Sequence, residues 1–215
     1  MATERPHRRV DPALTSAARQ STAPAGFDFI AYMRRLCDDI VARLPEFAHV
    51  NLAHVAMRGC QTRRPGRYGI QASLTPLRFK GGAQQTVRRG RQWTIQPLRG
   101  ADGSEMLYLL SYYLPRFLDL PLNEKLATVC HELWHIGPKF DGDIRRHEHG
   151  RCYAHGPSEK RFHAEMHVLA ERWLALKPAP ELYGELADGF AAIRSRHGRV
   201  LALRMPTPKL ILVRN

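Results

Sequence analysis

Five consecutive residues, His131, Glu132, Leu133, Trp134 and His135, form the pattern His-Glu-x-x-His. In an α-helix, positions i and i+4 lie on one face about 6 Å apart at Cβ, so both imidazoles can converge on one metal ion. The glutamate lies one step round the helix, where its carboxylate can reach a metal-bound water without binding the metal itself. The pattern therefore requires a helix here, mounted on an apolar core.

The surrounding sequence favours that helix. Val129, Cys130 and Ile136 supply an apolar flank together with the leucine and tryptophan of the pattern, as a site mounted on a core helix needs. A helix can begin near Pro121, and Gly137-Pro138 is a stop signal. Cys130, beside the first histidine, is expected to be a small buried hydrophobe.

Apolar periodicity and turn signals predict the other elements. Helices are expected at residues 27–44, 158–177 and 181–196, and strands at 50–57, 70–79, 92–98 and twice within 199–213. Hairpin corners are expected at Gly81-Gly82 and Asp102-Gly103. Residues 106–118 form a dense apolar run that fits either a buried strand or a buried helix. The order predicts an α+β fold with an N-terminal helix, antiparallel strands, the motif helix and C-terminal helices.

The length of 215 residues favours one domain. Residues 1–26 are expected to be a disordered basic arm, and residues 27–215 a single domain. No stretch approaches the roughly 18 apolar residues of a membrane-spanning helix, and the arm lacks the apolar region of a secretory signal. The four cysteines, Cys37, Cys60, Cys130 and Cys152, form no CxxC pair, so we expect reduced thiols and a cytoplasmic location.

Two histidines do not complete a catalytic zinc site, because such sites usually have three protein ligands and a water. The position six residues after His135, where some zinc enzymes have a third histidine, is Asp141. We prefer His155 as the third ligand, because it stands just ahead of the predicted helix start at Ser158, where a fixed backbone can aim its ring. The loop residues His147 and His149 remain alternatives. Further candidates lie on the following helix, namely Glu159, His163, Glu165 and His167.

Residues 130–145 resemble the phage-type HExxH metallopeptidases, small proteins with a HELxHI opening and an F-x-G-x-(I or L)-R segment behind it. The resemblance is carried by Cys130 to His135, Phe140, Gly142, Ile144 and Arg145. The stretch Ala154-His155-Gly156-Pro157 is similar, more distantly, to the SprT-like metallopeptidases, in which HExxH is followed by His-Gly and a helix. About 50 of the 215 residues are covered. The resemblance implies a small zincin-like domain and a zinc-dependent peptidase.

In such an enzyme, zinc lowers the pKa of its bound water to near 7, Glu132 acts as general base, and the hydroxide attacks a peptide carbonyl. An oxyanion partner is expected, with Arg145, Arg151 and Tyr153 as candidates. Each of these is equally well explained as a loop contact that orients another group. Cys152 and His155 could also form a metal pair, but no second pair lies nearby to complete a structural site.

Charge is distributed unevenly along the chain. Residues 47–101 contain ten Arg or Lys and no acidic residue, whereas residues 102–171 contain eight basic and eleven acidic residues. The basic region includes Tyr68, Phe79 and Trp93, so residues 58–99 could bind nucleic acid. The alternative is a solvated basic face, or one that binds acidic protein. The alternative function is thus a basic nucleic-acid-binding protein with a structural or vestigial zinc site. An intact Glu132 favours the peptidase, acting on protein or peptide.

Overall fold

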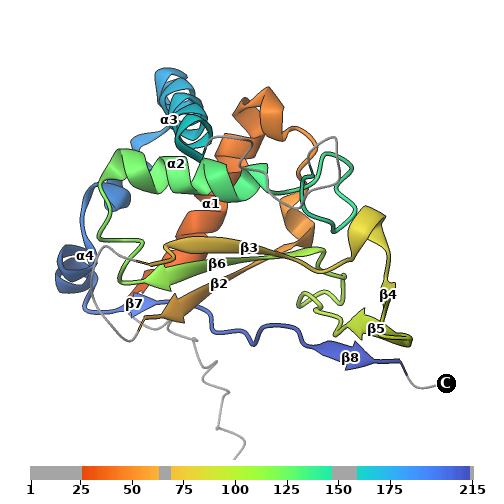
Figure 1. Ribbon diagram of the computed structural model, residues 1–215. Helices are drawn as coiled ribbons and strands as arrows, with labels where there is room; N and C mark the ends of the chain where they lie inside the picture. Colours follow the sequence, from red (N-terminus) through yellow and green to blue (C-terminus); the bar gives the residue numbers. More distant parts are fainter. Residues whose placement is uncertain (1–25, 63–68, 147–158, 214–215) are drawn as a thin grey trace, which may run out of the picture.

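The computed structural model describes residues 26–62, 69–146 and 159–213; the expected arm lies almost wholly outside them. The described residues form a mixed α+β arrangement, as predicted (Figure 1). Its α-helices are α1 (Phe29–Arg43), α2 (Leu122–Trp134), α3 (Glu159–Ala175) and α4 (Phe190–His197). Short 3-10 turns lie at Pro45–Phe47, Leu52–His54, Lys80–Gly82, Pro180–Leu182 and Gly184–Ala187.

The central sheet has the strand order β2-β6-β3, formed by β2 (Val55–Gln61), β6 (Tyr108–Leu114) and β3 (Ala72–Pro76). β3 is antiparallel to β6, as expected, but β2 is parallel to it. The expectation of purely antiparallel strands was therefore wrong here. A long connection through β3 and a second sheet separates the two strands, and such crossovers permit parallel pairing. The undecided run at 106–118 contains this middle strand.

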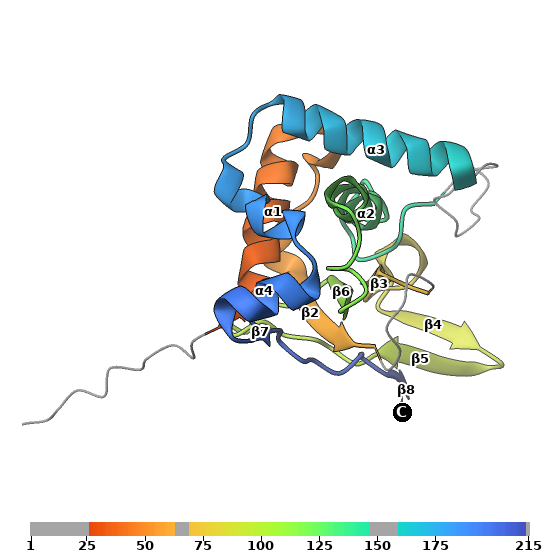
Figure 2. The same ribbon diagram turned by 90° about the vertical axis from the view of Figure 1, so that its left-hand side faces the viewer.

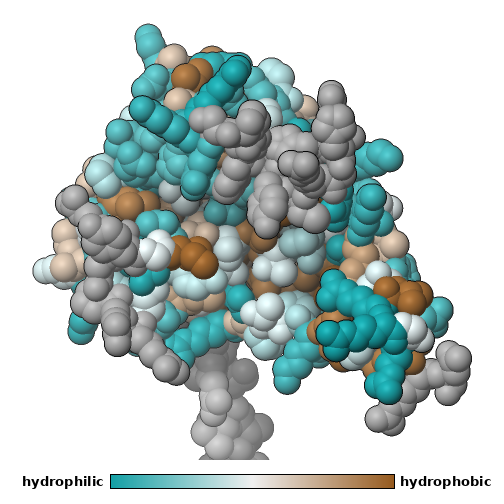
Figure 3. Space-filling view, in the orientation of Figure 1, coloured by the Kyte–Doolittle hydropathy of each residue, from teal (hydrophilic) through white to brown (hydrophobic). Residues whose placement is uncertain are grey.

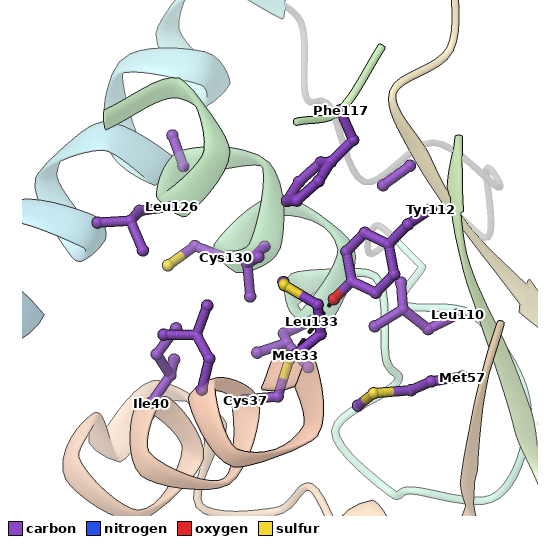
Figure 4. Packing of buried hydrophobic residues seen from close by; sticks show 14 of the residues in the cluster. Met33, Cys37, Ile40, Met57, Leu110, Tyr112, Phe117, Leu126, Cys130 and Leu133 are labelled. Atoms are coloured by element: carbon purple, nitrogen blue, oxygen red, sulfur yellow. Dashed lines mark hydrogen bonds between the residues drawn. The ribbon is translucent and has the colours of Figure 1, made fainter. Parts of the chain in front are cut away.

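The two faces of β6 serve different clusters of side chains. Tyr108, Leu110 and Tyr112 join the main core under the helices, whereas Leu109 joins a smaller cluster on the other face. Figure 4 shows part of the main core, where the hydroxyl of Tyr112 lies 3.6 Å from the thiol sulfur of Cys37. Because both faces of the strand are buried, its sequence lacks polar alternation.

Helices α1 and α2 cover one face of the central sheet, and α3 crosses above α2 (Figure 2). Asp28 caps α1, since its carboxylate accepts a hydrogen bond from the amide of Ala31. The indole of Trp173 on α3 donates to Asp39 on α1 at 2.8 Å, which ties the outer helix to the core. This bond, together with the packing of α3 on α2, holds α3 in place over the motif helix.

A second, antiparallel sheet has the order β4-β5-β8 and is formed by β4 (Gln85–Arg88), β5 (Arg91–Ile95) and β8 (Leu210–Leu212). Its hairpin turns at Arg89 and Gly90, both with positive φ. The prediction of a corner at Gly81-Gly82 was wrong, because these residues form a 3-10 turn between two different sheets. The turn at Asp102-Gly103 is present, closed by a bond from the Gly103 amide to the Gly100 carbonyl.

The C-terminal part departs from the prediction in one respect. Residues 180–187 form 3-10 turns, and α4 begins only at Phe190, with Gly198 ending it at a φ of 77°. A small parallel sheet pairs β1 (Phe27–Asp28) with β7 (Val200–Leu201). The described helices include none with the length and apolarity of a membrane span.

Candidate metal centre

The two histidines of the motif face the same side of α2. Their ring centroids lie 4.7 Å apart with the ring planes at 72°. His135 directly follows the last residue of α2 but keeps helical backbone angles, and its amide donates to the carbonyl of His131. The helical spacing expected from the sequence therefore holds across the whole motif.

Glu132 points in another direction, into the packing between α2 and the sheet. Only 6% of its surface is exposed. Burial raises the pKa of its carboxyl to about 7, and a polar contact with the backbone amide of Leu74 partly opposes that shift. Leu74 lies on β3, the outer strand of the central sheet beside α2. A carboxyl group held in this way can exchange a proton close to neutral pH.

The apolar flank of α2 explains why the motif is held rigidly. Leu126, Val129, Cys130 and Leu133 are buried in the main core (Figure 4). Cys130 is a buried free thiol whose pKa burial raises to about 12, as expected of a small hydrophobe. This packing leaves the two motif histidines on another side of the helix.

The end of α2 is capped by Arg145. Its side-chain Nε donates to the Trp134 carbonyl at 2.7 Å, its backbone amide donates to the His135 carbonyl at 2.8 Å, and its guanidinium lies 4.4 Å from the Trp134 ring centroid. Of the three expected oxyanion candidates, Arg145 thus has its guanidinium in contact with the helix end. The other two candidates, Arg151 and Tyr153, lie outside the described residues.

The loop behind the motif is built around Tyr108. The tyrosine hydroxyl donates to the Asp143 carbonyl at 2.9 Å and accepts from the Gly142 amide at 3.1 Å, and the Phe140 ring packs on the tyrosine. Gly142 has a φ of 86°, and a Cβ there would lie 2.4 Å from Cγ of Arg78. The residues that carry the resemblance thus form a scaffold for the end of α2.

The third ligand preferred from the sequence, His155, and its alternatives His147 and His149 lie outside the described residues. Of the candidates on α3, His163 lies near the motif, whereas Glu165 is engaged elsewhere. The His163 ring centroid lies 6.0 Å from that of His131. Glu165 is instead paired with Arg161 at 3.1 Å, on the side of α3 that faces Trp134.

Sequence reasoning missed one residue of this region. Glu124 lies two turns before His131 on α2, and its carboxylate meets His163 and His167 of α3. Two features of the sequence pointed toward it. Glu124 and His131 are spaced i, i+7 and so share one face of α2, and the two α3 histidines are spaced i, i+4 and so share one face of α3. Neither shows that the two helices bring these side chains together.

The basic residues expected to form one face are separated by the fold. Arg58 is 8% exposed and donates to Ser111 and to the C-terminal segment, and Arg78 pairs with Glu105 at 2.6 Å. Four of the expected residues line a hollow on the second sheet. Over this region, at the lower right of Figure 3, hydrophilic side chains gather beside hydrophobic ones. The hollow is lined by Arg88, Arg89, Arg91, Trp93 and Leu210. Arg63, Arg64, Arg67 and Tyr68 lie outside the described residues.

Comparisons of the chain with protein-family models, with curated proteins and with solved structures found no match. The resemblance to phage-type and SprT-like metallopeptidases rests on the residues quoted above. Three of the four cysteines, Cys37, Cys60 and Cys130, are free thiols, and Cys152 lies outside the described residues.

Proposed function

We propose that this protein is a cytoplasmic zinc metallopeptidase with a zincin-like fold. One observation carries the proposal. The imidazoles of His131 and His135 lie 4.7 Å apart on one face of α2, and the carboxyl group between them in sequence, that of Glu132, is buried against the outer strand of the sheet. A purely structural metal site has no need of that carboxyl group.

The donor set fits zinc, which binds imidazole nitrogen readily and keeps a water position open in catalytic sites. His131 and His135 would hold the ion, with His155 as the proposed third ligand. When bound, zinc supplies a Lewis acid that polarises a peptide carbonyl and makes a water molecule more acidic. Arg145 supports the site by fixing the end of α2, and so the ring of His135.

Glu132 performs the proton transfers in this proposal. Its carboxylate accepts a proton from the attacking water, the water oxygen bonds to the peptide carbonyl carbon, and the carbon–nitrogen bond breaks. The proton held by Glu132 then passes to the departing amine nitrogen. A pKa of about 7 suits both transfers, because the group can accept and release a proton near neutral pH.

The outer strand β3 supports a peptide as the substrate. Gln71 and Leu77, on either side of this strand, bond to Tyr113 of β6 and to Leu107 just before it. Because bonding alternates along an antiparallel strand, the backbone of Ala72 and Leu74 points away from β6. The Leu74 amide already contacts the Glu132 carboxyl there, so a peptide would use the other backbone groups of this edge. An extended peptide can add to such an edge through main-chain hydrogen bonds. That would bring a scissile bond beside Glu132.

The experiment measures zinc content and peptide hydrolysis on the full chain. We expect about one zinc to be lost in His131→Ala and in His135→Ala, together with activity. Glu132→Gln should retain that zinc and lose hydrolysis by a factor of about 100 or more. Glu165→Gln, an exposed carboxyl on α3, is the control and should retain both. Hydrolysis that survives in Glu132→Gln would contradict the proposal.

The second sheet favours one further candidate function, the binding of nucleic acid. The arginines at 88, 89 and 91 cluster with Trp93 around one hollow, which combines positive charge with an aromatic ring. Phosphates bind the former, and bases stack on the latter. The salt dependence of DNA or RNA binding tests this candidate.

A further inference from the structure

A second group of metal-binding side chains lies where α3 crosses α2 (Figure 2). Glu124 comes from the first turn of α2, and His163 and His167 come from successive turns of α3. Each offers one ligand atom, and all three atoms lie within 4.8 Å of one another. The closest pair is Nε2 of His167 and Oε2 of Glu124, at 3.4 Å.

The spacing of these atoms suits a zinc-sized ion. With bonds of 2.0–2.1 Å and tetrahedral angles, zinc ligands lie roughly 3.3 Å apart. The pair formed by Glu124 and His167 already has this separation. His163 is exposed, so a change of its side-chain torsions can close the remaining distance without disturbing the core. The side chains of Glu124 and His167 are 40% and 27% exposed, which leaves a route for the ion and for water ligands.

The cluster is a neighbour of the His131–His135 pair but shares no residue with it. The ring centroid of His163 lies 6.0 Å from that of His131 and 6.0 Å from that of His167. Donor groups therefore follow the line of contact between the two helices, with the motif pair at one end and Glu124 at the other.

We propose that Glu124, His163 and His167 bind a second divalent transition-metal ion, which fastens α3 to α2 beside the motif pair. Two imidazoles and one carboxylate suit zinc, cobalt or nickel. An ordinary ion pair needs only one histidine beside a carboxylate, as in the 3.1 Å contact of His197 on α4 with Glu185 of the preceding turn, where the other partner of Glu185 is Arg196, which is no metal ligand. The third donor, His163, is what distinguishes the cluster from such a pair.

The test is a calorimetric Zn²⁺ titration of the metal-free full chain. We expect two ions per wild-type chain, one in the double variant His163→Ala/His167→Ala, and one in His131→Ala/His135→Ala. Glu124→Gln should weaken one of the two sites by at least about tenfold. The matched control His197→Ala removes a histidine from an ion pair of the same kind and should still bind two ions.

A second readout does not depend on activity. In the His131→Ala/His135→Ala background, Zn²⁺ should still raise the Tm, and adding His163→Ala/His167→Ala should abolish that rise. The proposal is overturned if His163→Ala/His167→Ala binds as many ions as the wild type with equal affinity, or if His131→Ala/His135→Ala binds none. One ion in the wild type that is lost only with the α3 histidines would support this site and contradict the proposed peptidase.

Discussion

Glu132 on α2 and Asp143 in the loop that follows are buried to the same extent, each with 6% of its surface exposed, but their surroundings differ. The Asp143 carboxylate accepts hydrogen bonds from Arg146 and from the amides of Gly81 and Ile144, at 2.7 to 2.8 Å. Burial alone would raise its pKa, but these partners hold the pKa below its usual value. At Glu132 burial dominates and the pKa rises to about 7.

The difference separates a carboxyl whose ionisation stabilises the fold from one whose ionisation is opposed by burial, as the proposed proton transfer needs. Ionised Asp143 stabilises the fold, because it ties the loop behind α2 to the turn before β4. Ionising Glu132 costs free energy of folding, and such strongly shifted groups in polar clusters are typical of functional sites. The two regions are adjacent along the chain, so substitutions in each can be compared in one protein.

The largest effect is expected at Asp143. Replacing Asp143 by Ala removes one acceptor of Arg146 and the bond partner of two backbone amides, and should lower the free energy of unfolding by roughly 3–5 kcal/mol at pH 7. Because the folded pKa is depressed, the stabilisation is present above the unfolded pKa and is lost as pH falls through the folded value. Urea unfolding measures this. Asp102→Ala, in an exposed turn, is the control, and an equal effect there would refute the structural role.

At Glu132 the sign is reversed. In zinc-free protein, Glu132→Gln should raise the free energy of unfolding at pH 8 by up to about 3 kcal/mol and change it little near pH 4. Between about pH 4.5 and pH 7 the unfolded chain has lost this proton while the folded chain still holds it. The wild type therefore loses stability as the pH rises through this range, until Glu132 ionises in the folded state as well. Urea unfolding between pH 4 and 8 with a chelator measures the difference, which should be absent for Glu165→Gln. A pH-independent difference would contradict the assigned cause.

Helices were predicted well from the sequence, and strand pairing was not. The apolar spacing at residues 27–44, 121–136 and 158–177 depends on neighbours within one or two turns, and each segment contains a helix with similar bounds. The direction of β2 relative to β6 depends on where a long connection returns, which no local pattern encodes. β4 was missed because its alternation is brief and mostly exposed.

The same distinction applies to the candidate site. The face shared by His131 and His135 follows from their spacing within one helix. The meeting of Glu124 with His163 depends on how α3 crosses α2, so only the folded chain reveals it. The hydrogen bond from Arg145 to the carbonyl at the end of α2 likewise depends on the path of the loop.

The third ligand bears on the Glu132 side of this comparison, because the proposed zinc site of His131 and His135 is complete only with a third protein ligand. His155→Ala should weaken zinc binding at the motif by about 100-fold, or roughly 2.7 kcal/mol. His147→Ala and His149→Ala should weaken it far less, because His155 lies only four residues before the start of α3, closer than either of them. Competition with a chelating dye measures all three affinities. Loss of zinc in His147→Ala but not in His155→Ala would move the ligand upstream and weaken the similarity to SprT-like proteins.

The smallest expected effect concerns the basic hollow, which lies on the second sheet, whereas the two carboxyl groups lie on α2 and in the loop that follows it. If Arg88, Arg89 and Arg91 contact phosphates, their replacement by Gln should reduce the salt dependence of DNA or RNA binding by up to about three units, one per lost contact. Zinc content should not change, because the motif lies on α2, in a segment with more acidic than basic residues. Binding measured across a salt series gives the slope.

A matched triple variant decides between local recognition and net charge. Replacing Arg161, Arg194 and Arg199 by Gln removes the same charge from exposed positions on other elements. If the hollow recognises nucleic acid specifically, only the variant with Arg88, Arg89 and Arg91 replaced should show a weaker salt dependence of binding. Trp93→Ala should then reduce the affinity for single strands further, because the ring can stack on bases. Equal slopes in both triple variants would mean that the positive charge acts through the field of the whole protein. In that case the second sheet is a solvated basic face, and the buried carboxyl at Glu132 remains the main indication of function.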